Sequence, residues 1–227
     1  MFVRFTVLVV LSLALPFAYE RISPFRLGKV YRTSGARGSG EGVASPYTFL
    51  AEGTQSYVFL SKDQKTVLKL FKNVEGVEKT LEACKLALEI PELTGMVSIH
   101  LGREGLPPIA LKDRLGRTHR IDPAHTPFIL QKKASPFFRT LRTASREERT
   151  QLIHSFHALL QEMSRLGIAN LDNSLGRNYG FIEKKAVVID CGKLAYAPEL
   201  TEQREAHMIR RLNKWLQKVP TQYTSPH

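Results

Sequence analysis

The sequence predicts an α+β protein with two lobes, because strand patterns fill its first half and helix patterns fill its second half. Between residues 46 and 133, short apolar segments alternate with turn-forming residues, which is typical of strands. After residue 145, apolar residues recur at helical spacing. We therefore expect a strand-rich N-lobe over residues 46–133 and a reduced, helical C-lobe over residues 134–227.

A short apolar segment opens the chain. Arg4 precedes an uncharged run that ends at Ala18, which is the pattern of a secretory signal and is short for a transmembrane helix. Residues 1–18 are thus predicted to be a signal peptide or an anchor that gives membrane association, and the chain is predicted to be exported (periplasmic, membrane-anchored or secreted). A buried N-terminal strand is the alternative. Residues 19–45 are rich in Arg, Ser and Gly and are predicted to form a flexible linker.

The elements of the first half follow in order. A helix is predicted over residues 75–90, ended by Pro91, because apolar residues recur there at helical spacing. The remaining apolar segments predict strands, and the turn sequence SKDQK separates the second strand from the third. These strands cover residues 47–50, 57–60, 66–71, 96–101, 109–112, 118–121 and 127–132.

The second half contains two amphipathic helices. Ser145 and Glu148 have the spacing of a capping box at the start of the first helix, and Gly167 follows its end. The second helix has an apolar stripe from Met208 to Val219. Between them, residues 167–181 are predicted to be a polar loop, and an apolar strand ends at Asp190.

Charge and cysteine content exclude several classes of protein. The formal net charge of +12 favours anionic partners. The basic residues are spread along the chain, however, and no zinc-finger or RNA-recognition motif occurs, so no dedicated nucleic-acid binding is expected. Two cysteines are too few for a structural zinc site or a disulfide scaffold.

Two segments of the first half have features of a phosphate-binding site. In residues 50–60, a turn containing Gly53 and Ser56 joins two strands, and small residues let backbone N–H groups approach an anion. Lys69 interrupts an apolar strand, where a buried ammonium group needs phosphate oxygens or a carboxylate as its partner. The alternatives are a simple β-hairpin and an edge-strand lysine that faces water.

Two segments of the second half have features of a metal site. Asp172 and Asn178 lie in the predicted polar loop, and Asp190 ends an apolar strand just before Gly192. A carboxylate and an amide placed in this way can hold a hydroxyl group and a metal ion. The alternative is ordinary turn chemistry, which Asn and Asp also favour.

In this order, the four segments resemble the protein-kinase-like superfamily. AEGTQSYVF (51–59) is similar to the glycine-rich loop, which implies nucleotide contacts from Gly53, Ser56 and Val58. VLK resembles the strand that carries the phosphate-binding lysine, here Lys69. FILQKK (128–133) resembles the last N-lobe strand and hinge, which implies that Gln131 lies near adenine.

The resemblance also implies roles for the second half and two cofactors, ATP and Mg²⁺. Asp172 matches the catalytic base, while Asn178 and Asp190 match the magnesium ligands. Glu78, Glu82 and Glu89 are all candidate helix partners of Lys69; Glu82 lies in the middle of the helix, and the spacing of Glu89 from Lys69 is closer to that in familiar kinases.

The sequence departs from this family in ways that bear on activity. Asn170 and Leu171 replace the His and Arg of the catalytic loop, and Asn178 lies one position further from Asp172 than in protein kinases. No Ala-Pro-Glu segment follows Asp190, and residues 191–227 are too few for the usual peptide-binding helices. The resemblance is therefore to a reduced or atypical kinase.

The resemblance further implies that the two cysteines are neighbours. Cys191 occupies the middle position of the Asp-Phe-Gly segment, which in that fold packs beneath the helix that carries Cys84. A disulfide between them, coupling redox state to the nucleotide site, is one expectation. Two separate buried thiols are the alternative.

Three functions follow as hypotheses. The first is an ATP-dependent phosphotransferase with an unknown protein or small-molecule acceptor. The second is an exported pseudokinase that binds or scaffolds without turnover. The third is a basic structural protein that binds an anionic surface and needs no nucleotide.

Overall fold

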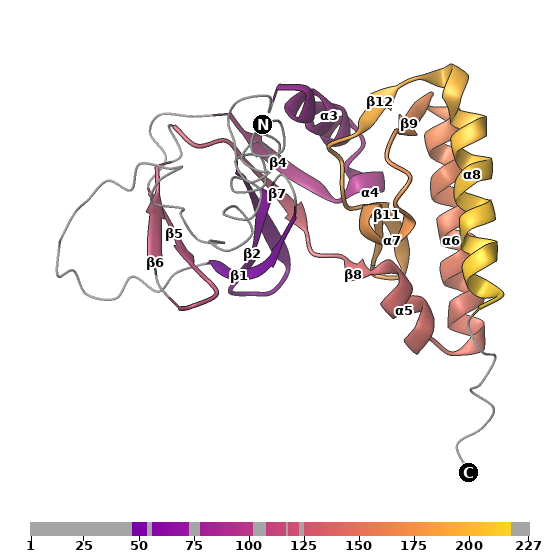
Figure 1. The fold of residues 1–227 in the computed structure, drawn as a ribbon, viewed down its shortest axis with the longest axis horizontal. Coiled ribbons are helices and arrows are strands. Elements are labelled where there is room, and N and C mark those ends of the chain that lie inside the picture. Colours follow the sequence, from indigo (N-terminus) through magenta and orange to yellow (C-terminus); the bar gives the residue numbers. More distant parts are fainter. Residues whose placement is uncertain are drawn as a thin grey trace, which may run out of the picture.

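The computed structural model describes residues 47–53, 56–72, 78–101, 108–116, 118–122 and 125–218. Figure 1 shows a β-sheet at one end of the molecule and long helices at the other. The predicted α+β class is confirmed. The predicted signal and linker lie outside the described residues. Within the described ranges, no helix is both long and apolar enough to cross a membrane.

Seven strands form the large sheet, in the order β4-β7-β3-β2-β1-β5-β6. The pairing of β1 with β5 is parallel and the other pairings are antiparallel. In this register Lys69 lies opposite Val58 on one side and Ile129 on the other. The strands are β1 (Tyr47–Glu52), β2 (Ser56–Ser61), β3 (Thr66–Phe71), β4 (Met96–His100), β5 (Ile109–Lys112), β6 (Thr118–Ile121) and β7 (Phe128–Lys132).

Two helices connect β3 to β4. Helix α3 (Glu78–Glu89) buries Thr80, Ala83, Cys84 and Ala87 on one face. Pro91 does end this helix, as predicted, but it also begins a second short helix, α4 (Pro91–Thr94), because a proline fits the first turn of a helix. Gly95 then closes α4 in the left-handed conformation.

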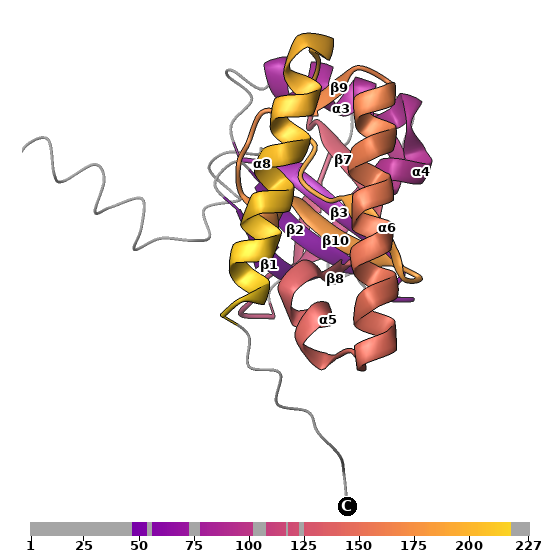
Figure 2. The same ribbon diagram turned by 90° about the vertical axis from the view of Figure 1, so that its right-hand side faces the viewer.

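Helices α5 (Phe137–Thr143), α6 (Arg146–Arg165) and α8 (Pro198–Leu216) make up the helical end of the molecule. Figure 2 shows α6 and α8 side by side. The predicted capping box of α6 is confirmed, since the Ser145 hydroxyl accepts from the Glu148 N–H and the Glu148 carboxylate accepts from the Ser145 N–H. Helix α5 was not predicted.

Residues 167–196 contain more regular structure than the sequence predicted. The expected polar loop over residues 167–181 is wrong except at Gly167 and residues 171–174, because residues 168–170 and 179–181 pair as strands and residues 175–178 form a short helix. Strand β10 pairs with both β11 and β8, and β12 pairs with β9. The elements are β8 (Ser135–Pro136), β9 (Ile168–Asn170), α7 (Leu175–Asn178), β10 (Tyr179–Ile182), β11 (Lys185–Val188) and β12 (Leu194–Tyr196).

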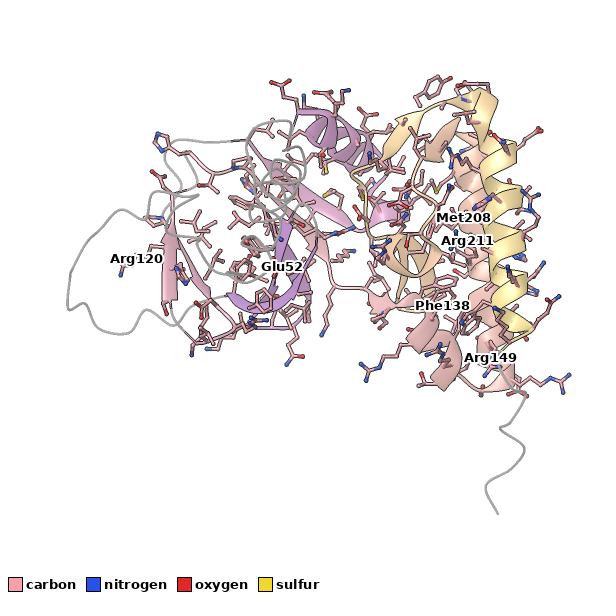
Figure 3. The ribbon with its side chains drawn as sticks, viewed as in Figure 1. Glu52, Arg120, Phe138, Arg149, Met208 and Arg211 are labelled. Atoms are coloured by element: carbon pink, nitrogen blue, oxygen red, sulfur yellow. The ribbon has the colours of Figure 1, made fainter. Side chains whose placement is uncertain are left out.

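One apolar core joins the two ends of the molecule. It includes Phe71 and Ile129 of the sheet, Cys84 of α3, Phe156 of α6 and Leu212 of α8. Side chains fill the space between the sheet and the helices (Figure 3). A smaller core within the sheet part contains Tyr57, Phe59, Leu68, Leu70, Leu111, Ile121 and Phe128.

Candidate functional site

A cavity lies where the sheet meets α3 and the segment that follows β11. It encloses about 450 Å³, including the solvent at its mouth. It brings together four residues predicted to bind nucleotide or metal, namely Gly53, Ser56, Lys69 and Asp190, and both cysteines. The lining residues are Gly53, Ser56, Lys69, Phe71, Thr80, Cys84, Ile129, Asp190, Cys191 and Gly192.

The turn between β1 and β2 forms one wall of this cavity. The Gly53 N–H donates to the Ser56 carbonyl oxygen at 2.8 Å, which is a hairpin contact. Val58 follows on β2, half-buried and opposite Lys69. The structure therefore places Gly53 and Ser56 in the wall of the cavity that Lys69 also lines, and the Gly53 N–H is already engaged in the hairpin.

Lys69 connects the sheet to the second half of the chain. Its half-buried ammonium group donates to the carbonyl oxygen of Ile189, the residue before Asp190. An ammonium group has three donors. Among the described residues, one of these donors is engaged, which leaves two Lys69 N–H groups for a ligand in the cavity.

The structure does not bring the candidate glutamates to Lys69. Glu82 and Glu89 are exposed, and the Glu82 carboxylate accepts from Lys85 at 2.6 Å. In the described part of the chain, no ion pair joins Lys69 to either glutamate. Helix geometry explains this, because Glu82 lies about 200° around the helix from Thr80 at ~100° per residue. Helix α3 presents Thr80 and Cys84 to the cavity instead.

Asn178 is buried at the end of α7 and contacts the backbone of both candidate acidic residues, Asp172 and Asp190. Its side-chain N–H donates to the Asp172 carbonyl oxygen at 3.2 Å, and its own carbonyl oxygen accepts from the Asp190 N–H at 3.3 Å. The side chain is 0% exposed, and its Oδ1 has no hydrogen-bond partner among the described residues. A buried acceptor without a donor is costly and calls for a partner such as a cation.

Asn170 links the two candidate carboxylate segments, a role that sequence analysis missed. Its Oδ1 accepts from the Asp172 N–H at 3.0 Å, and its Nδ2 donates to the Asp190 carbonyl oxygen at 3.4 Å. The Asp172 carboxylate in turn accepts from the Ser174 N–H at 2.8 Å. The only signal in the sequence was the replacement of a catalytic-loop histidine by Asn170.

The oxygen donors near the cavity do not make up a complete metal site of protein ligands. They are of the kind that a magnesium ion prefers. The exposed Asp190 carboxylate accepts only a long bond from the Gly192 N–H, at 3.4 Å. Within the described ranges, no three His, Cys, Asp or Glu side chains are grouped to hold a metal. Magnesium usually binds one or two carboxylates together with substrate phosphates. Asp190 lines the cavity, whereas Asn178 and Asp172 are not among its lining residues, so a magnesium site shared by Asp190 and Asn178 stays a prediction.

Gln131 is not one of the residues that line the cavity. Its side chain is buried, and its amide N–H groups donate to the carbonyl oxygens of Thr94 at 2.6 Å and Val188 at 3.2 Å. It also contacts the Cys191 sulfur at 3.8 Å. The side chain thus cross-links β7, α4 and β11, and the predicted adenine contact stays a prediction.

Cys84 and Cys191 are buried free thiols in the wall of the same cavity. Burial raises the pKa of Cys84 to about 11 and the pKa of Cys191 to about 12. The positive charge of Lys69 lowers the pKa of each thiol and so opposes the effect of burial. The structure contains no bond between them, so the disulfide stays a prediction.

Comparison with known proteins adds no family. No protein-family model matches the sequence, and a search of curated proteins found no match. The functional argument therefore rests on the residues of the site itself.

Proposed function

We propose that the chain binds Mg·ATP in a protein-kinase-like fold and transfers phosphate to an acceptor hydroxyl group. The strand order supports this proposal. Strands β1, β2, β3, β7 and β4 are antiparallel neighbours, and α3 lies between β3 and β4 in sequence. Lys69 on β3 faces the cavity, as the resemblance to the superfamily implies.

The observation that carries the proposal is the environment of Asn178. Its amide N–H is used to hold the Asp172 backbone, and its Oδ1 is buried without a donor. The same residue binds the backbone of Asp190. Asn178 thus fixes the candidate base through its side chain and the candidate metal ligand through its backbone carbonyl oxygen, and its Oδ1 is an oxygen that a cation would satisfy.

Each candidate residue of the site would have a separate role in phosphate transfer. Lys69 would neutralise the nucleotide phosphates, and Asp190 with Asn178 would hold magnesium, which supplies charge neutralisation when bound. Asp172 would orient the acceptor hydroxyl and accept its proton. Such positioning and neutralisation are most of what this reaction requires from a protein.

Nucleotide titration tests the proposal. We expect a non-hydrolysable ATP analogue with Mg²⁺ to bind the full chain in isothermal titration calorimetry. Lys69→Met and Asp190→Asn should each weaken binding at least about tenfold, because a hydrogen bond to a charged group contributes about 1.5–3 kcal/mol. Lys85→Met and Asp63→Asn, at exposed positions, are the matched controls. Equal affinities for all four variants would exclude the site.

A second candidate function is nucleotide binding without transfer. The exposure of Glu82 and Glu89 favours it, because among the described residues Lys69 is paired with the Ile189 carbonyl oxygen and not with a carboxylate. Transfer of labelled phosphate separates the two candidates. An Asp172→Asn variant that binds nucleotide but labels no acceptor or water supports transfer, provided that the wild type does label one. Equal, background-level labelling in both supports binding alone.

A further inference from the structure

Two arginines hold the loop that carries Asp172. Arg204 of α8 donates from Nη1 to Asn173 Oδ1 at 2.5 Å, and Arg177 of α7 donates from Nε to Ser174 Oγ at 2.9 Å. Asn173 and Ser174 are neutral residues that directly follow Asp172. Two guanidinium groups therefore contact the two residues that follow the candidate base.

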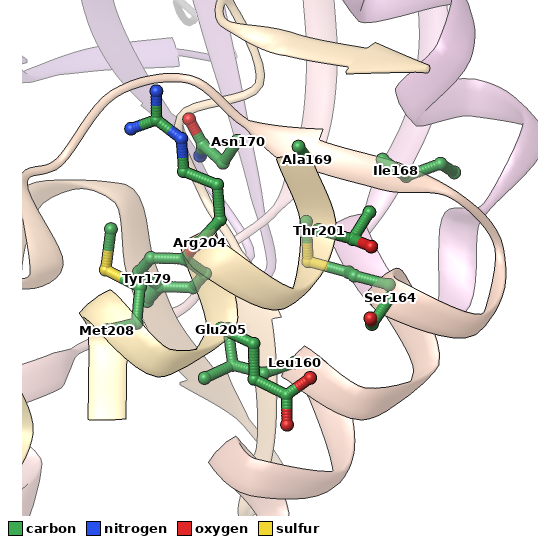
Figure 4. A pocket seen from close by; sticks show the side chains of 11 residues that line it. Leu160, Ser164, Ile168, Ala169, Asn170, Tyr179, Thr201, Arg204, Glu205 and Met208 are labelled. Atoms are coloured by element: carbon green, nitrogen blue, oxygen red, sulfur yellow. The ribbon is translucent and has the colours of Figure 1, made fainter. Parts of the chain in front are cut away.

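Neither guanidinium is neutralised by a carboxylate in the part of the chain that the structure describes. The nearest acidic neighbour along α8 is Glu205, and Figure 4 shows the Arg204 and Glu205 side chains pointing in opposite directions. The Arg204 Nε is buried and has no hydrogen-bond partner among the described residues. A guanidinium group has five N–H donors, and among the described residues one donor of each arginine is engaged.

Further arginines lie along α8 beyond Arg204, and Glu202 and Glu205 lie on the same helix. The pKa of His207, one turn further along α8, is lowered by burial and then by Arg211, Arg210 and Arg204. These arginines extend the positive field along the helix that borders the loop. An anion that approaches Asp172 from this side is attracted before it makes contact.

We propose that the acceptor carries a phosphate monoester beside its reacting hydroxyl group and that Arg204 and Arg177 bind this phosphate. The inference rests on the proposed phosphate transfer. Guanidinium groups match phosphate oxygens in pairs, and two of them balance the charge of about −2 that a phosphate monoester carries at neutral pH.

Binding at this point would set the acceptor hydroxyl next to Asp172. In the transfer step the hydroxyl oxygen forms a bond to the γ-phosphorus of ATP. The bond from that phosphorus to the bridging oxygen breaks and ADP leaves, while the hydroxyl proton passes to Asp172. Anchoring the acceptor in this way lowers the entropic cost of the reaction.

Calorimetry with glycerol 3-phosphate as the probe tests the inference. The full chain is first saturated with Mg²⁺ and the non-hydrolysable ATP analogue, so that the probe does not bind beside Lys69. We expect glycerol 3-phosphate to bind and glycerol not to bind. Arg204→Gln and Arg177→Gln should each weaken binding about tenfold or more. Arg204→Lys should also bind weakly, because lysine lacks the paired N–H donors of the planar guanidinium group. Lys214→Gln, at an exposed position on α8, is the control.

Co-sedimentation with vesicles distinguishes a soluble phosphate from a lipid headgroup. Phosphatidylcholine vesicles with and without phosphatidic acid are compared, using the same variants. Binding of phosphatidic acid, but not of glycerol 3-phosphate, through Arg204 and Arg177 would identify a lipid acceptor.

The outcomes separate this inference from the proposed function. If the nucleotide analogue binds but neither phosphate probe does, or if Arg177→Gln has no more effect than Lys214→Gln, the inference is wrong and the nucleotide site stands. If a phosphate probe binds through both arginines while the nucleotide does not, the proposed function fails and the anion site stands. Arg177 is exposed, so its variant answers the question even if Arg204→Gln does not fold.

Discussion

A single substitution at Asn178 tests whether a cation binds at this residue. An Asn178→Asp change places a carboxylate oxygen against the Asp172 carbonyl oxygen and puts a charge in a fully buried position. Without metal, we expect the free energy of unfolding to fall by about 3–5 kcal/mol, which is typical of an uncompensated buried charge. Millimolar Mg²⁺ should restore much of this loss in urea unfolding.

Asn213→Asp, at an exposed position on α8, is the control for this experiment. Its stability should change little and should respond to Mg²⁺ as the wild type does. If Mg²⁺ affects the two variants equally, no cation binds at Asn178.

The two thiols give the site a pH dependence at alkaline pH. Their pKa values of about 11 and about 12 exceed the ordinary value of 9.0, so above pH 9 the unfolded state releases protons that the folded state retains. Stability from the buried thiols is complete below pH 9 and is lost as the pH rises through the folded values. We expect the wild type to lose stability between pH 9 and pH 11 more steeply than a Cys84→Ala, Cys191→Ala double variant.

Urea unfolding at a series of pH values measures this difference under reducing conditions. A thiol titration of unreduced, unfolded protein accompanies it, because two reactive groups indicate free thiols and none indicates the predicted disulfide. Parallel pH profiles of the wild type and the double variant would contradict the burial of the thiols.

At the scale of elements, the short helix α7 depends on a close contact with α5. A Cβ atom added at Gly176 would lie 2.6 Å from two carbons of the Phe138 ring, and that ring stacks on Trp215 of α8 with centroids 4.8 Å apart. Gly176→Ala should therefore cost roughly 1–3 kcal/mol, as overpacking does. It should also weaken nucleotide binding, because α7 ends at Asn178.

Phe138→Leu tests whether this contact is the cause. The double variant Gly176→Ala, Phe138→Leu should be more stable than the sum of the two single effects predicts, since the smaller side chain makes room. Thermal unfolding of the four proteins in the cycle gives the coupling. If the two substitutions have strictly additive effects on stability, the contact between Gly176 and Phe138 is not the cause of the destabilisation.

The capping box at the start of α6 is a second test at this scale. Ser145→Ala removes the acceptor of the Glu148 N–H, which lies 3.2 Å from the hydroxyl oxygen. We expect the free energy of unfolding to fall by about 1 kcal/mol. Thr150→Ala, at an exposed position in the same helix, should change stability much less. If both variants behave alike in urea unfolding, the cap contributes nothing specific.

At the scale of the whole molecule, the shared core couples the predicted lobes. Phe71, Met96 and Ile129 from the sheet part lie in one apolar cluster with Phe156 and Leu212 from the helices. Neither half can bury these residues alone. We therefore expect one cooperative unfolding transition, with near-ultraviolet and far-ultraviolet circular dichroism giving the same midpoint in urea.

Expression of residues 46–133 alone extends this test. The isolated segment should lack a cooperative transition, because its side of the cluster would face water. Two separate transitions in the full chain, or a cooperatively folded fragment, would show that the lobes are independent.

The sequence by itself determined the parts of this protein that have a regular pattern over several residues. Periodicity predicted the seven strands of the large sheet and helices α3, α6 and α8, and the spacing of Ser145 and Glu148 predicted a cap. The order of Gly53, Lys69 and Asp190 was enough to predict residues that the structure brings to one cavity. Local signals suffice here because each element is amphipathic on its own.

Only the tertiary structure decided which side chains reach the site. The burial of Thr80 and Cys84 turned Glu82 toward solvent, and the packing of β7 directed Gln131 to backbone carbonyls. Short elements such as α7 and β9 have too few residues for a periodic signal, since partners far along the chain stabilise them. Long-range packing, which no local pattern encodes, therefore set the geometry around Asn178.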